Sequence, residues 1–130
     1  GSIEIDDLPR VWNERYTNDL GVTPPDYKDG CMQDVHWFGG TIGGSFQGYT
    51  LGNLLSAQFY EEALKAHPSI PVEMTAGKFD TLHGWLKNNI YQYGSKFTAP
   101  ELIQRVTGGG LEVAPLMRYL KSKYGALYGI

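Results

Sequence analysis

One stretch of this 130-residue sequence gathers side chains of the types that do proton and oxyanion chemistry. Residues 30–37, which we call the octet, read Gly-Cys-Met-Gln-Asp-Val-His-Trp. A carboxylate two residues from a histidine, as Asp34 is from His36, can fix the tautomer of the imidazole and raise its basicity. An imidazole oriented in this way can donate a hydrogen bond to a developing oxyanion, so the octet is a candidate catalytic segment.

A second candidate donor follows a glycine-rich segment. Six glycines lie between Gly39 and Gly52, and such a density gives the backbone access to positive φ and a close approach to a ligand or another chain. The segment leads to Tyr49, at the start of a predicted helix. A phenol near a helix N-terminus can serve as a second donor to an oxyanion.

The other reactive side chains favour structural roles. The sequence has no His-Glu-x-x-His string, and His36, His67 and His83 do not have a recognised zinc-ligand spacing. His67 and His83 are therefore expected to be structural. Cys31 lacks a helix N-terminus or an obvious basic neighbour, so the sequence does not predict a reactive thiolate.

The composition excludes several classes of protein. Hydrophobic residues make up 42% and charged residues 19% of the chain, with a net charge of −3, which is typical of a globular domain rather than a disordered chain. Eleven Lys and Arg against fourteen Asp and Glu leave no basic excess, so neither nucleic acid nor a membrane surface is an expected partner.

The compartment and the extent of the domain can also be predicted. The sequence contains one cysteine, no signal peptide and no apolar run long enough to span a membrane, so we expect a cytoplasmic protein. Gly1 and Ser2 resemble the remnant of a cleaved tag. Residues 3–130 are then expected to form one domain, which can be an excerpt from a longer protein.

Apolar periodicity predicts an all-α fold of about five helices around the glycine-rich loop, with no convincing strand. The first helix is expected at 8–20, with a proline in its first turn and a glycine after it. A capping box at Thr98 and Glu101 starts the fourth. The remaining helices are predicted from about 46 or 49 to 66, over 79–93, and from Pro115 to a C-terminal cap at Gly125.

The octet matches the pattern G-x-x-Q-D-x-H-W of the carboxypeptidase Taq family, which comprises cytosolic zinc metallocarboxypeptidases that release single residues from peptide C-termini. Four further stretches resemble the C-terminal part of that family, so that the similarity covers nearly the whole chain. They lie within residues 7–14, 48–53, 85–98 and 118–129. The resemblance implies that residues 3–130 are the C-terminal segment of a larger helical zinc-peptidase fold.

The resemblance also implies roles for individual residues. His36 and Tyr49 are the expected catalytic residues, as partners of the tetrahedral intermediate. Gln33, Asp34 and Trp37 are the expected substrate-binding residues, which shape the wall of the cleft. Many relatives read G-Y-F-P-T-Y-A-L-G where this chain has residues 44–52; Tyr49 aligns with the second tyrosine of that string, while the proline and the first tyrosine are replaced.

The zinc ligands of the family come from an H-E-x-x-H helix and a downstream glutamate, and an I-R-x-x-A-D stretch recognises the substrate carboxylate. Neither motif occurs in this sequence. We therefore expect the segment to bind no metal and to hydrolyse no peptide by itself. For the complete enzyme the resemblance implies zinc, or another divalent metal, as cofactor. The implied partners are a peptide with a free C-terminus, the missing N-terminal part of the same chain and a second copy in a homodimer.

Two functions are compatible with these observations. The first is a portion of a zinc metallocarboxypeptidase that supplies cleft-wall and oxyanion-stabilising residues but not the zinc ligands. The alternative is a stand-alone helical binding or adaptor domain without catalysis. The octet favours the first, because an adaptor has no evident need for Gln33, Asp34 and His36 together. An H-E-x-x-H string encoded upstream of Ile3 would decide between them.

Overall fold

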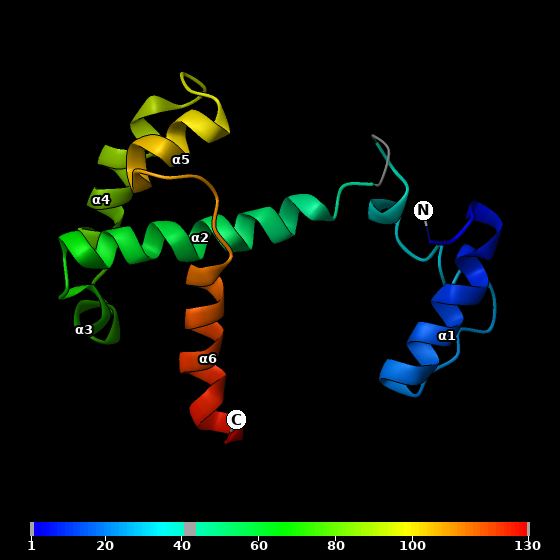
Figure 1. Ribbon diagram of the computed structural model, residues 1–130. Helices are drawn as coiled ribbons and strands as arrows, with labels where there is room; N and C mark the ends of the chain where they lie inside the picture. Colours follow the sequence, from blue (N-terminus) through cyan, green and yellow to red (C-terminus); the bar gives the residue numbers. More distant parts are fainter. Residues whose placement is uncertain (1, 41–43, 130) are drawn as a thin grey trace. The chain divides into compact units, whose positions relative to one another are not determined.

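The computed structural model describes residues 2–40 and 44–129 (Figure 1). Over these residues it contains helices and no strand, which confirms the all-α prediction. Backbone contacts divide the chain into two compact units, Gly1–Tyr49 and Thr50–Ile130, and each is described separately. Part of the predicted glycine-rich loop (41–43) and the first residue of the predicted tag remnant lie outside the described residues.

The described residues of the first unit form one α-helix, α1 (Leu8–Leu20), as the sequence predicts. A short 3₁₀ turn, η1 (Ile5–Asp7), precedes it, and Pro9 lies in its first turn, where the missing N–H costs no helical hydrogen bond. Gly21 ends the helix in the left-handed conformation, with φ of 70°. After a long loop, a second 3₁₀ turn, η2 (Val35–Trp37), forms within the octet.

The described residues of the second unit form five α-helices, the first of which begins in the last residues of the first unit. They are α2 (Gln47–Ala66), α3 (Ile70–Thr75), α4 (Asp80–Asn89), α5 (Ala99–Thr107) and α6 (Ala114–Tyr128), with a 3₁₀ turn, η3 (Tyr91–Tyr93), after α4. The capping box at Thr98 and Glu101 is confirmed, since each residue bonds the backbone N–H of the other.

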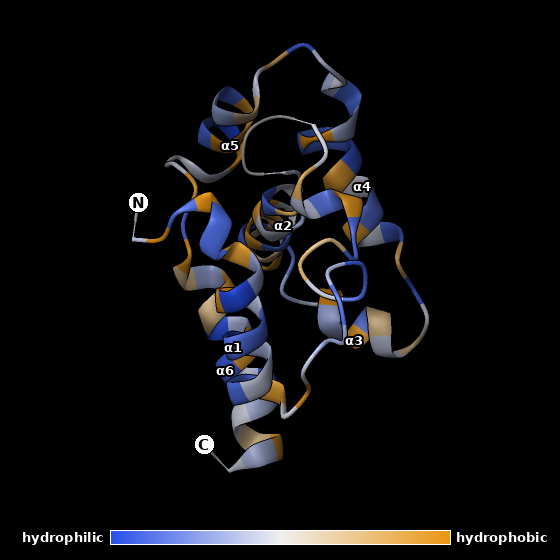
Figure 2. Ribbon diagram, turned by 90° about the vertical axis from the view of Figure 1, so that its right-hand side faces the viewer, coloured by the Kyte–Doolittle hydropathy of each residue, from blue (hydrophilic) through white to orange (hydrophobic). Residues whose placement is uncertain are grey.

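The core of the second unit lies where the C-terminal half of α2 meets α3 and α4. Ala63, Ile70 and Trp85 are its buried residues. Hydrophobic and hydrophilic residues alternate along α4 (Figure 2), and its apolar residues Leu82 and Leu86 pack against the core beside Trp85. Burial of one apolar helix face of this kind supplies most of the stability of a short helix.

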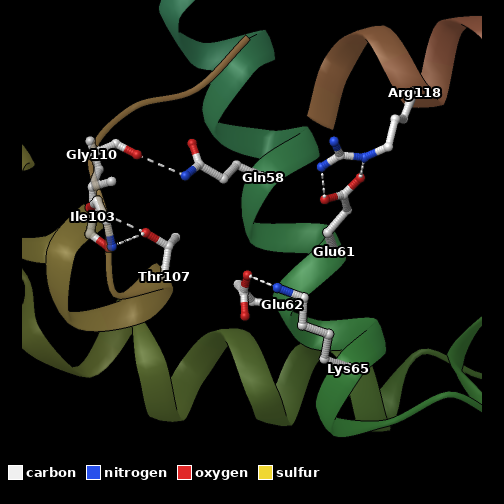
Figure 3. Close-up of polar contacts among 9 residues, drawn as sticks. Gln58, Glu61, Glu62, Lys65, Ile103, Thr107, Gly110 and Arg118 are labelled. Carbon is white, nitrogen blue, oxygen red and sulfur yellow. Dashed lines mark hydrogen bonds and ion pairs between the residues drawn. The ribbon is translucent and has the colours of Figure 1, made fainter. Parts of the chain in front are cut away.

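Two polar contacts tie α2 to the chain around α6 (Figure 3). The buried Gln58 donates from Nε2 to the Gly110 carbonyl at 2.9 Å and accepts on Oε1 from the Glu112 backbone N–H at 3.1 Å. One turn further along α2, Glu61 accepts two hydrogen bonds from the Arg118 guanidinium, at 2.9 and 2.6 Å. Both ends of the Gln58 amide are thus used, as a buried amide requires.

Three sequence predictions about helices need correction. The helix α3 was not predicted, and its six residues are too few to display a helical period. The helix expected over 79–93 ends at Asn89, and Gln92 Nε2 donates to the Asn88 carbonyl, which a backbone N–H would bond in a longer helix. The cap expected at Gly125 is wrong, because α6 continues through Gly125 to a left-handed Gly129 with φ of 69°.

Candidate functional site

The octet positions its carboxylate and imidazole through a single 3₁₀ turn. Asp34 is the N-cap of η2, and its Oδ1 accepts the His36 backbone N–H at 3.0 Å. The same oxygen lies 2.8 Å from Nδ1 of the His36 ring. An N-cap aspartate favours this geometry because its side chain satisfies a backbone donor that the turn leaves free. The spacing of two residues therefore brings Asp34 and His36 into direct contact, as the sequence predicts.

Glycines allow two segments to approach the octet closely. Gly30 is buried, and a Cβ at this position would lie 2.8 Å from the Asp26 carbonyl oxygen. Gly44 has φ of 74°, and a Cβ there would collide with the backbone carbonyls of His36 and Trp37. The next residue, Ser45, donates its N–H to the His36 carbonyl at 2.8 Å. Glycine at position 44 is therefore a requirement of the site and not only of loop flexibility.

Aromatic rings surround the imidazole. The His36 ring lies 4.9 Å from the Phe46 ring and 5.8 Å from the Tyr49 ring, measured between centroids. Phe46 also contacts Trp37 at 4.3 Å and Tyr49 at 6.1 Å. Phe46 thus packs against the three other rings. Phe46 was not among the expected site residues, although it lies three residues before Tyr49 in the segment that leads from the glycines.

The electrostatics of the pair follow from its hydrogen bonds. Hydrogen bonds from the His36 backbone N–H and, next in size, from its ring lower the pKa of the Asp34 carboxyl below its ordinary value. The side chains of His36 and Asp34 are 39% and 42% exposed, so both reach solvent. An ionised Asp34 favours a proton on Nδ1 of His36, and Nε2 of a protonated ring can donate to an oxygen of a bound molecule.

The expected substrate-binding residues occupy different surroundings. Trp37 belongs to the aromatic cluster and contacts the indole of Trp12 on α1, edge to face, at 5.3 Å. Gln33 donates from Nε2 to the hydroxyl of Tyr16 on α1, at 3.2 Å. The structure therefore brings His36, Trp37 and Tyr49 together around Phe46, with Asp34 bonded to His36. Gln33 is directed toward α1.

The resemblance implies a metal for the complete enzyme, and the residues that the structure describes do not form a site for one. Across residues 2–40 and 44–129, no three His, Cys, Asp or Glu side chains gather closely enough to bind an ion. His83 instead lies 6.2 Å from the Tyr91 ring, and the carboxylate of Asp34 is engaged by His36. These residues can offer hydrogen bonds to an oxygen of a bound molecule.

None of the helices in the described part of the chain has both the length and the apolar character needed to cross a membrane.

Comparisons with known proteins identify the relatives of this chain. The profile of the carboxypeptidase Taq (M32) metallopeptidase family matches residues 1–124. Thermostable carboxypeptidase 1 of Thermus thermophilus is 44% identical over 129 residues, which are 99% of this chain and 25% of that protein.

Solved structures agree with the sequence comparison. The crystal structure of the M32 carboxypeptidase of Deinococcus radiodurans matches with a TM-score of 0.87 and 48% identity, over 100% of this chain and 26% of that one. Metallocarboxypeptidase 1 of Trypanosoma cruzi matches with a TM-score of 0.80 and 33% identity, over 95% of this chain and 26% of that one. The chain thus spans about a quarter of the length of the relatives it matches. It belongs to the carboxypeptidase Taq (M32) metallopeptidase family.

Proposed function

We propose that this chain is the C-terminal segment of a metallocarboxypeptidase that releases single residues from peptide C-termini. Family membership and the names of the relatives support this activity. The observation that carries the proposal is the 2.8 Å contact between Asp34 Oδ1 and His36 Nδ1 beside the ring of Tyr49. This contact is the means by which a carboxylate orients an imidazole toward a reacting oxygen.

His36 and Tyr49 are the residues to which we assign catalysis. Asp34 accepts from Nδ1–H of His36, and in the imidazolium form of the ring Nε2–H donates to the carbonyl oxygen of the scissile peptide as negative charge develops on it. Tyr49 is 64% exposed and its ring lies 5.8 Å from the His36 ring, which supports the proposal that its hydroxyl is a second donor. Two donors on one oxygen stabilise the tetrahedral intermediate more than the planar substrate.

Gln33, Asp34 and Trp37 form the proposed wall of the substrate cleft. The Trp37 ring supplies an apolar surface supported by Phe46, 4.3 Å away. Asp34 acts through His36, so it positions the catalytic group. We further propose zinc as the metal of the complete enzyme, bound by side chains outside the described residues. We also propose that the complete enzyme is a homodimer in the cytoplasm.

Exposed apolar surface supports the proposal that the segment works inside a longer chain. In the second unit, a groove of about 590 Å³ runs between α2 and α6 and is lined by Ala57, Tyr60, Leu82 and Leu120 among others. Val72, Leu127 and Tyr128 are 74%, 68% and 68% exposed. Apolar area of this kind is costly in water and is normally covered in a complete protein.

The experiment is a chimera in which this segment replaces the matching quarter of the Thermus thermophilus carboxypeptidase. We expect the chimera to hydrolyse a blocked dipeptide and the isolated 130-residue chain to show no turnover. His36→Ala in the chimera should lower kcat by about 10²- to 10³-fold, as loss of one oxyanion donor does, with a smaller effect on KM.

His83→Ala is the matched control, because His83 is exposed on α4 and contacts only a tyrosine ring among the aromatic residues described. It should leave kcat unchanged. Near-normal kcat in the His36→Ala chimera, together with a lowered melting temperature, would make the octet a packing motif and favour the alternative of a binding domain without catalysis.

A further inference from the structure

Two aromatic residues of α1 lie against the octet. Trp12 and Tyr16 are one helical turn apart, and their rings stack with centroids 5.1 Å apart and an interplanar angle of 18°. Both side chains are half-buried. Neither residue was among the expected site residues.

The two residues contact the octet on either side of Asp34 and His36. The Tyr16 hydroxyl accepts the Gln33 amide N–H at 3.2 Å, across 17 residues of sequence. The Trp12 indole meets the Trp37 indole edge to face at 5.3 Å and 76°. Asp34 and His36 lie between Gln33 and Trp37 in the sequence. The aromatic pair therefore holds the chain on both sides of the imidazole.

In the described part of the first unit, no buried hydrophobic side chain holds the octet in place. Its fully buried residues there are Pro24, Gly30 and Gly44, which constrain the backbone but offer little apolar area. The Trp12 indole N–H is itself buried, with no hydrogen-bond partner among the described residues. The position of the indole is thus determined by ring packing and not by hydrogen bonding of its N–H.

We propose that Trp12 and Tyr16 are positioning residues, which clamp Gln33 and Trp37 and thereby fix the direction of the Asp34–His36 pair. The consequence for catalysis rests on the proposed function; the clamp itself does not. A misplacement of a catalytic group by about 1 Å can cost up to about 10²-fold in rate. Side chains that lock the rotamers of a reacting group are therefore part of the design of an active site.

Steady-state kinetics of the chimera test whether the clamp affects catalysis. Tyr16→Phe removes the acceptor of the Gln33 hydrogen bond and keeps the stack on Trp12, so we expect kcat to fall by about three- to tenfold with KM changed by less than about twofold. Tyr27→Phe is the matched control, since Tyr27 is 61% exposed in the same unit, and it should leave both constants unchanged.

Two further variants separate positioning from folding. Gln33→Ala should lower kcat to a similar extent, and the double variant with Tyr16→Phe should lose little more, because both changes break one contact. Among the variants of Trp12, Tyr16 and Gln33, Trp12→Ala should lower kcat most. Trp12→Phe should lower kcat less than Trp12→Ala does, because it retains an aromatic ring. Additive losses in the double variant, or unchanged kcat in Tyr16→Phe, would overturn the inference.

NMR of the 130-residue chain tests the clamp without reference to activity. In Tyr16→Phe we expect the side-chain amide protons of Gln33 and the ring protons of His36 to shift, with neither shifting in Tyr27→Phe. Unmoved His36 ring protons would overturn the positioning role even if the Gln33 amide moves. A chimera without any activity would instead overturn the proposed function, and the NMR result alone would then decide whether the clamp exists.

Discussion

The two units hold their side chains in place by different means. In Gly1–Tyr49, the described residues that are fully buried are one proline and two glycines, and the octet is fixed by a 3₁₀ turn, close backbone approaches and aromatic contacts. In Thr50–Ile130, the helices pack around Ala63, Ile70 and Trp85, and the buried Gln58 ties α2 to the segment before α6.

The difference separates two kinds of substitution effect. Side chains of the octet are partly exposed, so their loss removes little buried area and should act on chemistry more than on folding. Buried side chains of the second unit contribute apolar area and satisfied hydrogen bonds, so their loss should lower the free energy of unfolding. Tryptophan, glutamine and carboxylate residues occur in both units, which allows matched comparisons.

The largest effect on stability is expected for Trp85→Ala. Trp85 is 9% exposed and belongs to the core cluster, so its truncation should lower the free energy of unfolding by about 3–5 kcal/mol. Trp37→Ala is the matched change in the octet, where the side chain is 42% exposed, and should cost about 1 kcal/mol or less. Urea titrations followed by far-UV circular dichroism measure both. Equal losses would mean that the octet is part of a stabilising core.

The next effect concerns catalysis and the first unit alone. Tyr49→Phe in the chimera removes one proposed oxyanion donor and should lower kcat by about 10²-fold, at the low end of the range for such a donor. Combined with His36→Ala, the loss should be smaller than the product of the two single losses, because both donors act on one oxygen. Steady-state kinetics of the single and double variants measure this coupling. A fully multiplicative loss would show that the two side chains act at separate points.

The sequence predicted those elements whose signals are local. The helices α1, α2 and α5 follow from apolar spacing combined with proline and glycine at their ends. The Asp34–His36 contact is local too, because an aspartate N-cap two residues before a histidine brings both groups to the same turn. The six-residue α3 shows no periodicity, and Gly125 resembles a cap while costing a helix interior only about 1 kcal/mol.

The parts of the site that escaped prediction depend on packing between distant segments. The Tyr16 hydroxyl meets Gln33 across 17 residues, and nothing in either local sequence specifies that pairing. Phe46 contacts three other rings, and its segment approaches the carbonyls of the octet closely at Gly44. The sequence shows six glycines in this segment, but it does not show at which of them a Cβ would collide with another part of the chain.

A moderate effect is expected for the buried amide of the second unit. Gln58→Ala leaves the Gly110 carbonyl and the Glu112 N–H without their partner, and should cost about 1–3 kcal/mol in the free energy of unfolding. Gln104→Ala is the matched control, since Gln104 is exposed and donates to the Gly108 carbonyl at a helix end; it should stay within about 0.5 kcal/mol of the parent. Urea titrations of both variants measure these two changes in the free energy of unfolding. A similar loss in each would remove the special role of the buried contact.

The smallest effect is the pH dependence of two carboxylates, one from each unit. Hydrogen bonds from Arg118 lower the pKa of Glu61 below its ordinary 4.5, and hydrogen bonds from His36 lower the pKa of Asp34 below its ordinary 3.8. A carboxyl whose pKa is lower in the folded state stabilises the fold above its unfolded pKa, and that stabilisation is lost as the pH falls through the folded pKa. The affected window therefore lies below about pH 4.5 for Glu61 and below about pH 3.8 for Asp34.

The difference between the two units predicts which of the two carboxylates contributes to unfolding at acidic pH. Glu61 joins α2 to α6, so Glu61→Gln should lower stability at pH 7 and flatten the fall in stability on acidification. Asp34 is bonded only within its own turn in the contacts described. Asp34→Asn should therefore leave acid unfolding close to that of the parent while it shifts the ring protons of His36 in NMR spectra at neutral pH. If instead Asp34→Asn flattens acid unfolding as much as Glu61→Gln does, the octet stabilises the fold as the second unit does, and the separation between a chemical and a structural unit is wrong.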